Sequence, residues 1–157
     1  MTGSEVIVEV PDADAMRDLG AWLARACRAG DIVVLDGPLG AGKTTFTQGL
    51  AVGLGVAGPV TSPTFVIARV HRAAQGPDLV HVDAYRLSGL AELDDLDLDA
   101  SVADSLTVVE WGEGMAERLG EQVVDVRIAR DVSESSEHRT VRIRMPEGRE
   151  LPQAAGR

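Results

Sequence analysis

Residues 32–45, IVVLDGPLGAGKTT, decide the fold of this chain. They begin with a short β-branched run, which is typical of a strand that is covered on both faces. The run leads directly into glycines, and from Lys43 to about Leu54 the residues suit a helix. This segment therefore predicts a strand, a glycine-rich turn and a helix, in that order.

The turn matches a phosphate-binding motif in full. Gly37, Gly42, Lys43 and Thr44 occupy the fixed positions of G-x-x-x-x-G-K-[ST]. Glycines allow consecutive N–H groups to turn inward around phosphate oxygens, and the helix N-terminus adds partial positive charge. We expect Lys43, the single lysine among 15 basic residues, to reach the β- and γ-phosphates of a nucleotide, and Thr44 to offer its hydroxyl to Mg²⁺.

The composition narrows the class of protein. The 157 residues, 45% apolar and 25% charged, predict one domain over residues 1–147 and a loose tail over residues 148–157. The net charge of −10 and the aromatic content of 3% disfavour direct binding to nucleic acid. Because Cys27 is the single cysteine and the sequence shows neither a signal peptide nor a bilayer-length apolar run, we expect a cytoplasmic protein without membrane contact.

Apolar patterns elsewhere predict the remaining elements. Residues 6–10 alternate as a strand does, and Asp12 is placed to cap a helix that follows. The apolar runs 79–83 and 106–110 indicate two further strands, and strands that alternate with helices favour an α/β sheet with parallel pairs. Alternation within residues 124–145 predicts an antiparallel hairpin at a sheet edge.

Two carboxylates and two hydroxyls are candidates for the chemistry. Asp83 and Glu110 each end a predicted strand, where a magnesium-nucleotide site usually takes a carboxylate, and their spacing does not rank them. Ser62 and Thr64 flank Pro63 in a loop that could sense the γ-phosphate and the metal. An ordinary Ser/Thr turn explains this loop equally well.

Missing motifs reduce the possible functions. A guanine-specific switch protein usually reads its base with Asn-Lys-x-Asp, which is impossible here because the single lysine is in the phosphate loop. Three hypotheses for the function remain: a partner-dependent ATPase, a small-molecule kinase, and a nucleotide-gated binding module with negligible turnover. His71, His81 and His138 lack metal-ligand spacing, and we expect each to be structural or exposed.

Four pieces of the sequence together resemble one family of bacterial ATPases. They are G-P-L-G-A-G-K-T-T at 37–45, S-P-T-F at 62–65, H-V-D-A-Y-R at 81–86 and V-E-W at 109–111. In this combination and order they resemble the tRNA threonylcarbamoyladenosine biosynthesis ATPase family, TsaE. The resemblance implies a three-layer P-loop NTPase fold of the α/β class, with a mixed central sheet and the C-terminal antiparallel hairpin.

The resemblance also implies an activity and its partners. It implies an ATPase that uses ATP and Mg²⁺ and supports repeated rounds of N6-threonylcarbamoyladenosine formation at adenosine 37 of tRNA. The transfer itself would belong to TsaD in its complex with TsaB, so tRNA would be reached only through that complex. The oligomeric state is left open.

The resemblance also implies a role for each residue that matches a position of the family's motifs. Thr44 would be a direct Mg²⁺ ligand, Glu110 would complete the metal site, and Asp83 would be the Walker-B-like group that orients a water. Lys43 would act on the phosphates beside these two carboxylates, and Ser62 and Thr64 would form the switch. The residues assigned to ATP are Gly37, Gly40, Ala41, Gly42, Lys43, Thr44, Thr45 and Trp111.

Two departures from the family pattern concern the base side of the nucleotide. Gly112 follows Glu-Trp where the family commonly has proline, and Met16 stands where the first helix often gives a hydroxyl residue. A separate feature is the segment 92–117, which contains nine acidic residues and no basic one. We expect this segment to be a docking or regulatory surface for protein partners.

Overall fold

The computed structural model describes residues 4–38, 40–56, 68–73, 77–83, 104–110, 122–130 and 136–152. Within these ranges the chain forms seven strands and two helices. The strands are β1 (Glu5–Val10), β2 (Ile32–Asp36), β3 (Ala68–His71), β4 (Asp78–Asp83), β5 (Ser105–Glu110), β6 (Val123–Arg130) and β7 (Arg139–Arg144), and the helices are α1 (Ala13–Ala24) and α2 (Lys43–Leu54).

The described strands make one mixed sheet in the order β1-β7-β6-β2-β5-β4-β3. The central strand β2 runs parallel to β5 and β6, and β5 runs parallel to β4. The pairs β1–β7, β6–β7 and β3–β4 are antiparallel. The predicted α/β class, the mixed sheet and the C-terminal hairpin are confirmed.

The hairpin of β6 and β7 does not form the edge that the sequence predicts. The first strand pairs with β7 along its whole length, from Glu5 opposite Arg144 to Val10 opposite Arg139. Val6 and Val8 pack against the core while Ile7 is exposed, so β1 is an amphipathic strand that covers the outer side of the hairpin. At the other end of the sheet lies β3, a four-residue strand that the sequence analysis did not predict.

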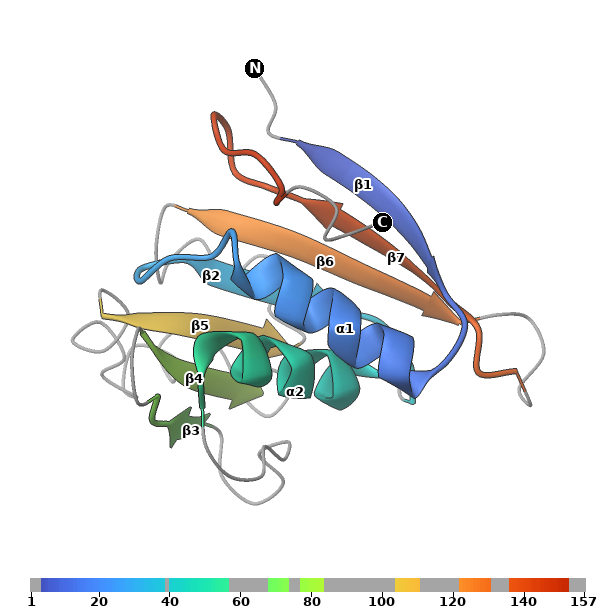
Figure 1. Cartoon of the computed structure of the whole chain (residues 1–157), viewed down its shortest axis with the longest axis horizontal. Coiled ribbons are helices and arrows are strands. Elements are labelled where there is room, and N and C mark those ends of the chain that lie inside the picture. Colours follow the sequence, from blue (N-terminus) through green and yellow to red (C-terminus); the bar gives the residue numbers. More distant parts are fainter. Residues whose placement is uncertain are drawn as a thin grey trace.

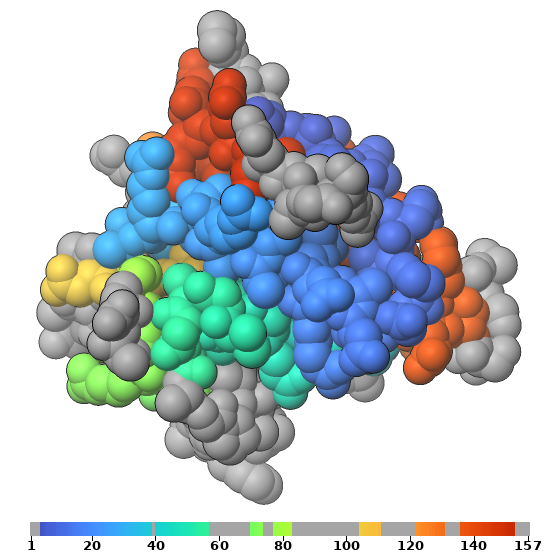
Figure 2. Space-filling model, in the orientation of Figure 1, coloured from blue at the N-terminus to red at the C-terminus, as the bar shows by residue number. Residues whose placement is uncertain are grey.

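Both described helices lie against the same face of the sheet (Figure 1). Asp12 caps α1 as predicted, because its carboxylate accepts a hydrogen bond of 2.9 Å from the N–H of Ala15. Figure 2 shows α1 in blue and α2 in green, in contact with each other on this face. Leu23 of α1 and Phe46 and Leu50 of α2 are fully buried between the helices and the sheet.

The central strands are buried on both faces. Leu35 and Val33 belong to the core beneath the helices, while Ile32 and Val34, which alternate with them, point to the opposite face and are buried as well. All six residues of β5 are buried. Such two-sided burial is what a three-layer arrangement requires, although no helix on the second face lies within the described residues.

The described part of the predicted tail is attached to the core through Arg149. Its guanidinium binds both oxygens of Asp31, at 2.6 and 2.9 Å, and donates to the carbonyl oxygen of Ala26 at 2.7 Å. Asp31 is 2% exposed, so this ion pair is buried beside the start of β2. Residues 153–157 lie outside the described ranges. In the described part of the chain, no helix is long and apolar enough to cross a bilayer.

Candidate nucleotide-binding site

The phosphate loop lies between the end of β2 and the start of α2, as the sequence predicts. Gly40 and Gly42 have φ angles of 78° and 106°, a left-handed conformation that side chains other than glycine rarely adopt. No side chain caps the N-terminus of α2 at Gly42. The N–H groups of its first turn, which have no intrahelical partners, therefore suit an anion such as phosphate.

Lys43 extends across this loop. Its Nζ donates a hydrogen bond of 2.8 Å to the carbonyl oxygen of Gly37, and the residue is 7% exposed. The ammonium is thus held inside the loop, where a phosphate that binds to the backbone N–H groups would meet it. Thr44 and Thr45 follow in the first turn of α2, and both are partly exposed. Leu39 lies outside the described residues.

The two candidate carboxylates are neighbours in the sheet. Asp83 is the register partner of Glu110 on the parallel strands β4 and β5, and Glu110 is also the partner of Leu35 on β2. The carboxyl ends of β2, β4 and β5 therefore meet at one edge of the sheet, which is where ligands bind in open α/β folds. The structure brings Asp83 and Glu110 together at the edge from which the phosphate loop emerges.

Glu110 has a buried partner that the sequence analysis did not assign to it. His81 Nε2 lies 2.7 Å from Glu110 Oε2; the His81 side chain is fully buried and that of Glu110 is 8% exposed. His81 Nδ1 has no hydrogen-bond partner among the described residues. Because a carboxylate oxygen accepts, the His81 ring donates an N–H from Nε2 to Glu110 Oε2.

His81 was expected to be structural or exposed, and its full burial excludes the exposed alternative. His81 is two residues after the core residue Leu79 and shares a face of β4 with it. In the described ranges, no group of three or more His, Cys, Asp or Glu side chains could hold a metal by itself.

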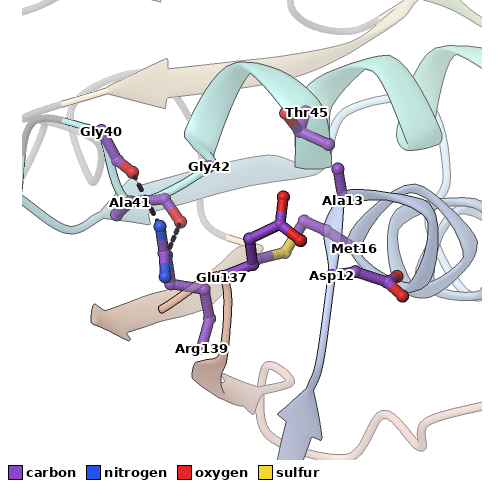
Figure 3. A pocket seen from close by; sticks show the side chains of 9 residues that line it. All are labelled: Asp12, Ala13, Met16, Gly40, Ala41, Gly42, Thr45, Glu137 and Arg139. Atoms are coloured by element: carbon purple, nitrogen blue, oxygen red, sulfur yellow. Dashed lines mark hydrogen bonds between the residues drawn. The ribbon is translucent and has the colours of Figure 1, made fainter. Parts of the chain in front are cut away.

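A cavity of about 160 Å³ lies beside the phosphate loop (Figure 3). It lies between the loop, the start of α1 and the segment that leads into β7. In Figure 3 the carboxylate of Glu137 points into the space between Arg139 and α1. Met16 lines this cavity, so the position that departs from the family pattern is indeed beside the phosphate loop. The lining residues are Asp12, Ala13, Met16, Gly40, Ala41, Gly42, Thr45, Glu137 and Arg139.

Two arginines lie close to the loop, next to the Asp12 and Glu137 carboxylates that line the adjacent cavity. The Arg139 side chain donates to the carbonyl oxygens of Gly40 and Ala41. A Cβ built on Gly40 would lie 3.5 Å from a guanidinium nitrogen of Arg130. With Lys43, these arginines give three cations beside a helix N-terminus, which favours an anionic ligand. No local motif in the sequence marks Arg130 or Arg139 as residues of this site.

Several predicted features lie outside the described residues. The switch residues Ser62 and Thr64 and the proposed base contact Trp111 are among them. So is the predicted docking surface at residues 92–117, except for residues 104–110, which contain β5.

Comparisons with known proteins agree with the resemblance. The family model described as threonylcarbamoyl adenosine biosynthesis protein TsaE matches residues 10–141. A Streptomyces coelicolor protein named tRNA threonylcarbamoyladenosine biosynthesis protein TsaE is 62% identical over 124 residues, which cover 78% of this chain and 84% of that protein. A Bacillus subtilis protein with the same name is 40% identical over 108 residues, 68% of this chain and 66% of that one.

A solved structure is similar in fold as well. The crystal structure of YdiB from Bacillus subtilis has a TM-score of 0.70 and 26% sequence identity, and the match covers 93% of this chain and 88% of that chain. This likeness in fold agrees with the mixed sheet and helices described above. The chain belongs to the TsaE family of threonylcarbamoyl adenosine biosynthesis proteins.

Proposed function

We propose that this chain is a Mg²⁺-dependent ATPase that acts with TsaD and TsaB to support repeated rounds of threonylcarbamoyladenosine formation on tRNA. The proposal rests mainly on one observation: the phosphate loop and two strand-end acidic residues lie at the same edge of the sheet. Lys43 is held within the loop by the carbonyl oxygen of Gly37, and Asp83 and Glu110 end adjacent parallel strands at the same sheet edge.

The residues at this edge suit Mg²⁺, which prefers oxygen ligands and retains several waters. We assign the Thr44 hydroxyl and the Glu110 carboxylate to the ion. When bound, Mg²⁺ would neutralise charge on the β- and γ-phosphate oxygens of ATP. His81 holds Glu110 Oε2 at 2.7 Å, so that the carboxylate keeps one orientation and its second oxygen is left for the ion.

The remaining roles follow from what each group can do. The N–H groups of the loop and Lys43 would hold the phosphates and stabilise the charge that develops as the terminal phosphoryl group departs. Asp83, beside Glu110, would orient the attacking water. The cavity that Met16, Thr45 and Glu137 line is our candidate for the base or ribose. Because the proposed reaction serves tRNA, the expected compartment is the cytoplasm.

The test is hydrolysis of ATP by the purified protein with Mg²⁺, alone and with TsaD and TsaB. We expect slow hydrolysis alone and faster hydrolysis with the partners. Lys43→Met should abolish hydrolysis, because it removes the positive charge from the phosphate loop. Methionine keeps an aliphatic side chain at this position, which is only 7% exposed. Arg142→Met is the matched control, since Arg142 is an exposed cation that pairs with Glu5 on β1.

Two other results would point to the competing functions. ADP formation that depends on an added small-molecule acceptor, with or without the partners, would indicate a kinase. ATP binding that Lys43→Met weakens, without hydrolysis under any of these conditions, would indicate a nucleotide-gated binding module.

A further inference from the structure

Arg139, at the start of β7, joins the C-terminal hairpin to the phosphate loop. Its Nε donates to the carbonyl oxygen of Ala41 at 3.1 Å and its Nη2 to that of Gly40 at 3.3 Å (Figure 3). Its Nη1 donates to the carbonyl oxygens of Ser136 and His138 at 2.8 and 2.9 Å. One guanidinium thus connects the start of β7 to two loop residues, Ala41 and Gly40, which precede Arg139 by 98 and 99 positions.

These contacts fix the direction of two peptide groups. A trans peptide is planar, so the N–H of one residue points away from the carbonyl oxygen of the residue before it. With the Gly40 carbonyl bound to Arg139, the Ala41 N–H turns to the other side, where it donates to Pro38 at 3.0 Å. With the Ala41 carbonyl bound to Arg139, the N–H of Gly42 also points away from the arginine, a direction that the φ of 106° at Gly42 permits.

The hairpin is close to the loop at a second point. A Cβ placed on Gly37 would lie 2.8 Å from the carbonyl oxygen of Ile128 in β6. The loop therefore contacts β6 at Gly37, and it contacts Arg139 at Gly40 and Ala41.

The contacts of Arg139 distinguish two possible roles. An arginine near a phosphate loop can bind the phosphate itself, for which its N–H groups must be available. Here four hydrogen bonds to backbone carbonyls use all but one of the guanidinium donors. A lysine could not replace this arrangement, because its compact ammonium lacks the planar fork that reaches both segments.

We infer that Arg139 is a positioning residue that directs the Gly42 N–H toward the bound phosphate by holding the Ala41 carbonyl on the opposite side. The inference rests on the proposed function in one respect, namely that the anion in the loop is the phosphate of a nucleotide. It adds a residue from the C-terminal hairpin to a site whose motif residues lie elsewhere in the chain.

The experiment compares Mg²⁺-ADP binding by the whole wild-type chain, Arg139→Lys, Arg139→Met and the control Arg142→Met, by calorimetry and without partners. We expect the dissociation constant to rise about tenfold or more for both Arg139 variants, because each loses charge-assisted hydrogen bonds to the loop. The control removes the same charge from the same strand at an exposed ion pair with Glu5, and it should change the constant by about twofold at most. Circular dichroism establishes that each variant is folded.

A second measurement follows the backbone amide of Gly42 by NMR. In the wild type its resonance should move downfield when ADP binds, because its N–H then donates to phosphate, and in Arg139→Lys this shift should be reduced. Wild-type affinity in Arg139→Lys would show that charge alone matters and would overturn the inference. A Gly42 resonance that ADP does not move in the wild type would overturn it whether or not the variants fold. A wild-type chain that does not bind ADP at all would instead overturn the proposed function, and the inference with it.

Discussion

Replacing His81 with leucine removes the buried partner of Glu110 with little change of side-chain volume. His81 Nε2 is 2.7 Å from Glu110 Oε2, and His81 is fully buried among the apolar residues of β4 and β5. Leucine fills this space but donates no hydrogen bond. Glu110 then loses the contact that fixes its orientation at the proposed Mg²⁺ site.

The expected magnitude follows from the kind of contact that is lost. Hydrogen-bond partners of metal ligands typically contribute about 10- to 100-fold to metal affinity. This corresponds to about 1.4 to 2.8 kcal/mol, the range expected for a hydrogen bond to a charged group. We therefore expect the Mg²⁺ concentration that half-saturates nucleotide binding to rise by this factor in His81→Leu.

The assay is a Mg²⁺ titration of fluorescent ADP binding, with glutamine and a neighbouring residue as controls. His81→Gln supplies an amide N–H and should recover part of the affinity. Thr107→Val changes a buried residue of β5 that faces away from His81, and it should leave the Mg²⁺ dependence unchanged. A folded His81→Leu protein with the wild-type Mg²⁺ dependence would refute the reasoning.

The remaining predictions concern stability and reactivity. Arg149→Met should lower the free energy of unfolding by about 3 kcal/mol in urea denaturation, because it leaves Asp31 buried without its cation, and adding Asp31→Asn should recover part of the loss. Thr107→Val should raise stability by about 1 kcal/mol in the same assay, since the Thr107 hydroxyl is buried and has no partner among the described residues; a loss of stability would contradict this. Burial raises the pKa of Cys27 from 9.0 to about 12, so iodoacetamide at pH 9 should alkylate the native thiol far more slowly than the unfolded one. The pKa of Cys27 is higher in the folded state than in the unfolded state, so the neutral thiol contributes its full stability below pH 9.0. This contribution is lost as the pH rises toward about 12. Alkali should therefore weaken the fold less in Cys27→Ala than in the wild type.

Local pattern was enough to predict the elements around the phosphate loop. The helix predicted from Lys43 to about Leu54 is α2, and the strand before the loop is β2. Both follow from short-range chemistry, namely a buried apolar run, glycines that permit left-handed turns, and a helix that begins at the lysine. The same reasoning placed Asp83 and Glu110 at strand ends, where the structure makes them register partners.

What the sequence did not reveal depends on pairing between distant segments. Alternation in β1 and β7 reports that each has one buried face, but not that β1 pairs with β7 and takes the edge from the hairpin. The short strand β3 was missed because four residues carry too little periodicity. The contacts of Arg139 with Ala41 and of His81 with Glu110 join residues 98 and 29 positions apart, and no local pattern marks them.

The measurement that tests the central proposal most directly is the number of threonylcarbamoyladenosine residues formed per TsaD when tRNA and threonylcarbamoyl-adenylate are in excess. With the wild-type chain and Mg²⁺-ATP, we predict many rounds of modification. With Lys43→Met in its place, the reaction should stop after about one round per complex, while Arg142→Met should behave as the wild type. The proposal would be contradicted if repeated modification continued equally well with Lys43→Met, or without this chain.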